Sequence, residues 1–271
     1  MQLSIKVENL REVQNAIEQS GKQARFAAAR ALTDTAESAR KDATARLAQV
    51  IKGPTPYTLN SLFKKPATKV SLASMVYVKD RGREQKTGSR GPDRIIGHLF
   101  KGGARESKNF ELVLRRAGLL PPGFFAVPGN AAPRDGNGNI PPAFITQMLA
   151  YFRAFGEQGY QANMTDKSRA RFEKRLGKKA GGTVEFFISR GRGFWFGRRS
   201  WREGRRQHLP PGVWQRVRYS QGSAIRPVLM FVKAPRYQQL INLEEIVGAT
   251  ARREFPAKFR QYYAEALATA R

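Results

Sequence analysis

Cysteine is absent from this 271-residue chain, and histidine occurs only twice, as His98 and His208. Without cysteine there is no disulfide framework, no thiol nucleophile and no thiolate site for zinc or iron–sulfur clusters. A Ser-His-Asp triad or a histidine metal site would have to be built from one of the two histidines. No run of about 18 apolar residues occurs either, so the sequence predicts no membrane-spanning helix.

Recognisable catalytic motifs are also missing. There is no Gly-Lys-Ser/Thr of a P-loop, and the glycines from Gly191 to Gly197 lack the Gly-x-Gly-x-x-Gly spacing of a dinucleotide site. His98 lies in an apolar stretch typical of a core or interface histidine, and His208 beside Leu-Pro-Pro-Gly indicates a surface loop. No carboxylate cluster has metal-ligand spacing. We therefore expect no enzymatic activity, no metal and no cofactor.

Acidic residues are scarce relative to basic ones. The chain has 21 Asp and Glu against 49 Lys and Arg, which gives a formal net charge of +28. A protein this basic needs a polyanion or an acidic partner. The apolar residues, 41% of the chain, are enough to build a folded core, so a wholly disordered basic tail is excluded.

The positive charge is concentrated between residues 167 and 206, where 14 basic residues stand against three acidic ones. Arginine forks match phosphate oxygens, and aromatic rings can stack on bases. Three interpretations stay open: contact with nucleic-acid phosphates, contact with an acidic protein, and a solvated surface in which the aromatic side chains fill a core or an interface. The candidate contact cations are Lys167, Arg169, Arg171, Lys174, Arg175, Lys178, Lys179, Arg190, Arg192, Arg198, Arg199, Arg202, Arg205 and Arg206, and the candidate stacking or interface aromatics are Phe194, Trp195, Phe196 and Trp201.

Hydrophobic periodicity predicts an α+β fold. Residues 22–50 predict a long alanine-rich helix that Gly53 and Pro54 end, and residues 243–270 predict a second long helix, in which Pro256 should cause a break or a kink. The alternation at residues 3–7 predicts a strand. Further strands are expected at residues 68–79, 124–127, 183–189, 213–219 and 227–232, and further helices at 109–117 and 141–155.

We expect a single domain over residues 1–271, in which an antiparallel sheet packs against the long N-terminal and C-terminal helices. Strands and helices do not alternate regularly, and this favours α+β over a doubly wound sheet. We also expect elaborated basic loops, which form insertion-like segments at about 80–108 and 156–210. Residues 80–94 have almost no apolar content and predict a loop, while residues 156–182 are polar without a firm period.

Six stretches together carry a resemblance to a known family. Each is weak alone, but their order and content resemble the minor tail protein Z family of tailed bacteriophages and prophages, the tail-completion proteins. The resemblance covers nearly the whole chain, and none of the stretches is catalytic. The stretches are residues 27–36 (AAARALTDTA), 53–63 (GPTPYTLNSLF), 102–111 (GGARESKNFE), 118–129 (GLLPPGFFAVPG), 209–214 (LPPGVW) and 226–237 (RPVLMFVKAPRY).

The resemblance implies a structural virion protein, made in the cytoplasm of a bacterial host, at the head-proximal end of a long tail. It would complete the tail, support head–tail joining, and contact or position the DNA end. Its implied partners are the tail terminator, tail tube, tape-measure protein, head–tail connector and double-stranded phage DNA. We expect a closed homo-oligomeric ring, with sixfold symmetry favoured over threefold. The alternative is a non-specific nucleic-acid-binding protein.

Overall fold

The computed structural model describes residues 2–6, 14–16, 18, 21–79, 91–156, 163–191, 208–234 and 236–269. The chain forms two compact units, one of Met1–Arg105 with Arg236–Arg271 (unit 1) and one of Glu106–Pro235 (unit 2). This division differs from the expected single domain, because two hydrophobic cores with no residue in common have formed. Both units combine helices with antiparallel strands, so the predicted α+β class is confirmed. None of the helices in the described ranges has the length and apolar character of a membrane-spanning segment.

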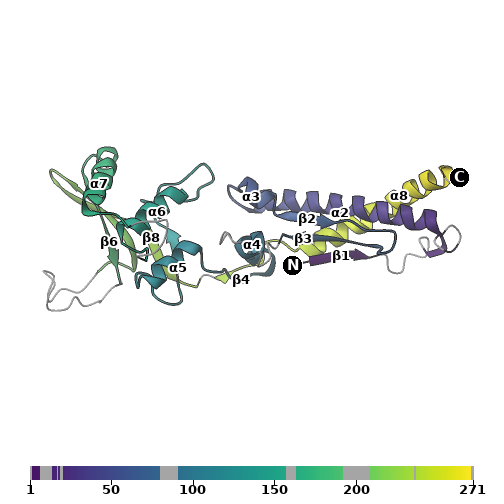
Figure 1. Cartoon of the computed structure of the whole chain (residues 1–271), viewed down its shortest axis with the longest axis horizontal. Coiled ribbons are helices and arrows are strands. Elements are labelled where there is room, and N and C mark those ends of the chain that lie inside the picture. Colours follow the sequence, from purple (N-terminus) through teal and green to yellow (C-terminus); the bar gives the residue numbers. More distant parts are fainter. Residues whose placement is uncertain are drawn as a thin grey trace. The chain divides into compact units, whose positions relative to one another are not determined.

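Unit 1 is built on two long helices, α2 (Lys22–Val50) and α8 (Leu243–Ala268), which lie side by side (Figure 1). They run antiparallel, since Arg30 pairs with Glu265 and Asp42 pairs with Arg253. The face of α2 toward the core is almost entirely alanine, whose small side chain lets other elements approach closely. The fully buried alanines are Ala24, Ala27, Ala28, Ala31, Ala36, Ala39 and Ala43.

The helix α8 continues through Pro256 to Ala268 instead of breaking there. Phe255 and Phe259, on either side of the proline, are both buried in the core of unit 1. Because most helical stability in proteins comes from tertiary packing, these two anchors hold both halves of the helix in place.

A three-stranded antiparallel sheet completes the core of unit 1. Its order is β1 (Gln2–Lys6), β3 (Ala73–Val78), β2 (Leu62–Lys65). The strand expected at 68–79 is therefore shorter, and β2 was not expected because two of its four residues are lysines. The small elements are α3 (Pro56–Leu59), α4 (Pro92–Lys101), β4 (Gly103–Ala104) and β9 (Arg236–Tyr237), of which β4 and β9 pair with each other. Residues 80–90 of the loop expected at 80–94 lie outside the described residues. The end of that expected loop is wrong, because α4 begins at Pro92, a residue suited to the first turn of a helix.

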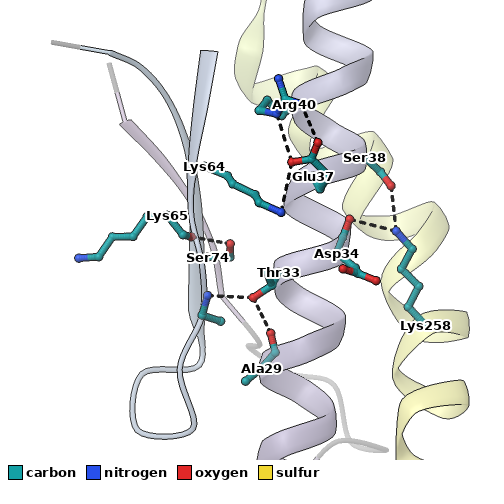
Figure 2. Close-up of polar contacts among 11 residues, drawn as sticks. Ala29, Thr33, Asp34, Glu37, Ser38, Arg40, Lys64, Lys65, Ser74 and Lys258 are labelled. Carbon is teal, nitrogen blue, oxygen red and sulfur yellow. Dashed lines mark hydrogen bonds and ion pairs between the residues drawn. The ribbon is translucent and has the colours of Figure 1, made fainter. Parts of the chain in front are cut away.

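Polar side chains tie α2 to the elements on both sides of it, as Figure 2 shows. On one side Glu37 accepts a 2.6 Å hydrogen bond from Arg40 and lies 3.2 Å from the Lys64 ammonium of β2. Those contacts, led by the bond from Arg40, lower the pKa of the Glu37 carboxyl to about 2. On the other side Lys258 of α8 donates to the Ser38 hydroxyl at 2.8 Å.

Unit 2 contains a four-stranded antiparallel sheet in the order β5 (Phe124–Pro128), β8 (Gly222–Lys233), β7 (Gly212–Tyr219), β6 (Thr183–Ser189). Its core is formed by apolar side chains of the sheet together with those of three helices. The helices are α5 (Asn109–Arg116), α6 (Pro142–Tyr151) and α7 (Asp166–Ala180).

The helix α7 is the main element that sequence analysis did not predict. Its 15 residues include only two large apolar side chains, Phe172 and Leu176, so a hydrophobic period is barely visible. Its ends are nevertheless well defined. The Thr165 hydroxyl accepts from the Ser168 amide at the N-terminus, and Gly181 adopts the left-handed conformation at the C-terminus with φ of 71°.

Candidate nucleic-acid interface

The described part of the basic segment lies in unit 2, on α7 and β6. Seven of the predicted contact cations belong to α7, and Arg190 follows β6 directly with an exposed side chain. The other ten candidates lie outside the described residues: Arg192, Phe194, Trp195, Phe196, Arg198, Arg199, Trp201, Arg202, Arg205 and Arg206. The structure therefore places the candidate cations of α7. The roles of the four aromatic candidates stay predictions.

Six of the seven cations on α7 lie on one exposed face, which we call the basic arc. Successive residues of an α-helix are separated by about 100°, so these six side chains fall within an arc of about 140°. Positions 167, 171, 174 and 178 form a stripe along the whole helix. The members of the basic arc are Lys167, Arg171, Lys174, Arg175, Lys178 and Lys179.

The two acidic residues of α7 lie away from the basic arc and are engaged elsewhere. Asp166 forms a 2.8 Å ion pair with Arg153, and Glu173 accepts a 2.5 Å hydrogen bond from the Tyr151 hydroxyl. No carboxylate in the described ranges forms an ion pair with a cation of the basic arc. Within the described ranges the arc is therefore a positive surface whose cations form no ion pair.

The opposite side of α7 is fixed to unit 2 through Tyr151 of α6. Phe172 is 4% exposed and stacks on Phe186 of β6 at 5.9 Å between ring centroids. The Tyr151 hydroxyl accepts from the Arg169 guanidinium at 3.0 Å and from the Phe186 amide at 3.2 Å. Burial, and then the bond to Glu173, raise the pKa of Tyr151, so this hydroxyl stays a proton donor.

Arg169 differs from the six cations of the basic arc. Its guanidinium lies 4.1 Å from the centroid of the Tyr151 ring, and its Nε lies 3.6 Å from Glu173. These contacts hold α7 in position, so Arg169 is a positioning residue in the structure. The composition of the segment predicted Arg169 as a contact cation. Its surroundings favour a structural role instead.

The C-terminal end of α7 touches the turn that leads into β6. A Cβ atom added to Gly177 would lie 2.3 Å from the carbonyl oxygen of Gly182, a distance that real Cβ atoms do not adopt. Only a glycine therefore permits this contact between helix and turn. Lys178 and Lys179 stand in the last turn of α7, where cations complement the helix dipole.

Two surface pockets flank the basic arc. The first, of about 290 Å³, lies between α6 and α7, and the second, of about 510 Å³, lies between α7 and the start of β6. The first is lined by Gln147, Met164, Ser168, Arg171, Phe172 and Arg175. The second is lined by Ala170, Glu173, Lys174, Gly177, Lys178, Gly181, Gly182 and Thr183.

Sequence analysis missed a second group of cations in unit 2, on β7. Arg216 and Arg218 share one face of the sheet and lie 3.5 Å and 3.1 Å from the Glu185 carboxylate of β6. The Arg216 guanidinium also lies 5.0 Å from the centroid of the Phe187 ring. The sequence signal that could have identified this group is a pair of arginines two positions apart in a predicted strand, because such residues lie on the same face of the sheet. Because Glu185 compensates part of its charge, this group is a weaker candidate than the basic arc.

The described ranges contain no group of His, Asp and Glu side chains placed to hold a metal ion. His98 is half-buried in α4, with its ring centroid 4.6 Å from that of Tyr237, and His208 is exposed, as expected for a surface residue. No family model, curated protein or solved structure matches this chain. The case for a nucleic-acid contact therefore rests on the geometry of α7.

Proposed function

We propose that this protein is a structural component of a long-tailed bacteriophage virion. It completes the head-proximal end of the tail, supports head–tail joining, and contacts double-stranded DNA there through unit 2. The assignment to the tail comes from the six family-like stretches of the sequence. The observation that carries the DNA contact is the basic arc, six exposed cations without a described acidic partner on one face of a firmly held helix.

Duplex DNA fits the basic arc in charge and length. A 15-residue helix is about 22 Å long, and over that distance the duplex presents about 13 phosphates. Contacts with phosphates fix position and carry no sequence information, which suits a protein that meets whatever DNA end is packaged. The tail lumen must also let DNA leave. Some of the net positive charge then faces acidic neighbouring proteins instead of DNA.

The alternative function, non-specific nucleic-acid binding outside a virion, uses the same basic arc. The two functions differ in location and not in the chemistry of the contact. The resemblance to tail-completion proteins favours the virion.

The salt dependence of DNA binding tests the role of the basic arc. If its six cations neutralise phosphates, log affinity of the full chain for a 20-bp duplex falls with log salt at a slope of about −5. The variant Lys167→Gln/Lys174→Gln/Lys178→Gln should reduce that slope by roughly 3, since each contact contributes about 0.9. Fluorescence anisotropy at several salt concentrations, with two duplexes of unrelated sequence, measures both slope and specificity.

The matched control removes the same charge from unit 1, in the variant Lys41→Gln/Arg46→Gln/Lys52→Gln, whose three positions are exposed. We expect this control to keep the wild-type slope. An equal decrease in both variants would show that net charge and not the basic arc governs binding. A wild-type chain that does not bind DNA would rule out the DNA contact and favour an acidic protein partner.

A further inference from the structure

The pocket between α6 and α7 is bordered by two arginines of the basic arc. We infer that Arg171 and Arg175 together hold one backbone phosphate of the duplex in this pocket, while the lysines of the basic arc attract neighbouring phosphates without a fixed geometry. This inference rests on the proposed DNA contact and assigns the residues that would grip the backbone.

Arg171 and Arg175 are four residues apart on α7. Side chains at that spacing are neighbours on one helix face, with Cβ atoms about 5–6 Å apart. Both line the same pocket of about 290 Å³. Two guanidinium forks that border one concavity can donate several hydrogen bonds to a single tetrahedral anion.

The Arg175 side chain is already oriented in the free protein. Its Nη2 donates to the Oε1 atom of Gln147 at 3.1 Å, and its guanidinium lies 5.4 Å from the centroid of the Phe172 ring. A guanidinium has five N–H donors, so the bond to Gln147 leaves four for a ligand. An oriented fork loses less conformational entropy on binding than a free lysine chain does.

The remaining lining residues favour an anion as well. Gln147 uses its carbonyl oxygen for Arg175, and this leaves its amide group as a donor. Ser168 donates to the Thr165 carbonyl at 2.9 Å and so helps to shape the rim of the pocket. Among the described residues, no carboxylate lines this pocket.

The second pocket provides the contrast. It is larger, about 510 Å³, and its cations are Lys174 and Lys178, which are point charges without a fork. Glu173 also lines it, and a carboxylate repels an anion. The first pocket is therefore the candidate phosphate site, and the second pocket on the same helix is its matched control.

A phosphate of duplex DNA fits better than a carboxylate of an acidic protein, because the pocket opens on a stripe of further cations. The stripe at positions 167, 171, 174 and 178 continues the positive surface along the helix. A polymer with a regular array of charges uses the pocket and the stripe together.

Replacement of arginine by lysine tests the inference, since it keeps the charge and removes the fork. In the full-length variant Arg171→Lys/Arg175→Lys we expect the affinity for a 20-bp duplex to fall about tenfold while the salt slope stays unchanged. The control Lys174→Arg/Lys178→Arg should not lose affinity. In ¹⁵N spectra of the wild-type chain, the Nε–H signals of Arg171 and Arg175 should shift when the duplex is added.

Each outcome decides a different point. Wild-type affinity in Arg171→Lys/Arg175→Lys, or arginine signals that do not respond to the duplex, would overturn the pocket and leave the DNA contact of the basic arc intact. Failure of the wild-type chain to bind the duplex would remove both proposals. Signals that respond to inorganic phosphate or to a poly-glutamate peptide, but not to the duplex, would assign the pocket to a free anion or an acidic protein and overturn the DNA assignment.

Discussion

Tyr151 is the side chain that joins the three elements around the basic arc. It is 2% exposed, it belongs to α6, and its hydroxyl connects Glu173 and Arg169 of α7 with the Phe186 amide of β6. A lysine or arginine on the arc can therefore be replaced without disturbing this junction. The four lysines of the arc are therefore not the residues that hold α7, whereas Arg175 also bonds to Gln147 of α6.

The variant Tyr151→Phe tests that junction. Removal of the hydroxyl leaves the buried Phe186 amide without its acceptor and takes one donor from Glu173, and this should lower the free energy of unfolding by about 1–3 kcal/mol. All three tryptophans of the chain lie in the sequence of unit 2, so tryptophan fluorescence in a denaturant titration reports on that unit. Tyr219→Phe, at a position 41% exposed, is the control and should leave the midpoint unchanged. Equal midpoints for both variants would contradict a structural role for the hydroxyl.

At the scale of elements, the position of α7 depends on the close contact of Gly177 with the turn before β6. Gly248 of α8 is also inside a helix, but among the described residues a Cβ atom there would meet only the Arg252 guanidinium, at 3.6 Å. The two glycines have the same propensity and different surroundings. Comparing substitutions at the two positions therefore separates the intrinsic cost of glycine in a helix from the benefit of the close contact that glycine permits.

We predict opposite effects for the two substitutions. Gly177→Ala should lower the stability of unit 2 by about 1–3 kcal/mol, because the new methyl group collides with a backbone carbonyl oxygen. Gly248→Ala should raise stability by up to about 1 kcal/mol, since alanine is the better helix former. Tryptophan fluorescence follows the first variant and far-UV circular dichroism the second. A stabilising Gly177→Ala would mean that the turn moves aside at no cost.

The elements differ in how well the sequence predicts them. The bounds of α2 are predictable, because its alanines recur at helical spacing and a Gly-Pro pair follows. In α7 most of the recurring residues are charged, so its period does not appear among apolar residues. The short strand β2 is hidden by Lys64 and Lys65, and the continuity of α8 through Pro256 depends on packing, which local rules do not include.

The candidate site is predictable in composition and not in arrangement. A count of charges locates the cations of α7 within the basic segment. It cannot separate Arg169, which packs on Tyr151, from Arg171, which faces outward, because that difference depends on the helix itself. Gln147 is 28 residues away from Arg175 in the chain, and only the tertiary fold brings them together.

For the molecule as a whole, the proposed tail function predicts where the protein is found. We expect it in purified phage particles, in a few copies per tail, at the end near the head, and as a closed ring about the tail axis. Quantitative mass spectrometry of purified virions measures the copy number, with a non-structural phage protein from the same lysate as the control. A protein confined to the lysate would refute the virion assignment, and one present on the tail as an off-axis monomer would refute the ring.

The pairing of β4 with β9 has a consequence for folding kinetics. Ala104 lies opposite Arg236, so the chain leaves unit 1 and returns to it at two adjacent points after about 130 residues. The core of unit 1 needs contacts between its two separated segments, and such long-range contacts normally slow folding. The entropy of loop closure grows only with the logarithm of loop length, however. Once unit 2 has its own core, it acts as a short structured connection, and α2 can find α8 almost as if the two helices were neighbours in sequence.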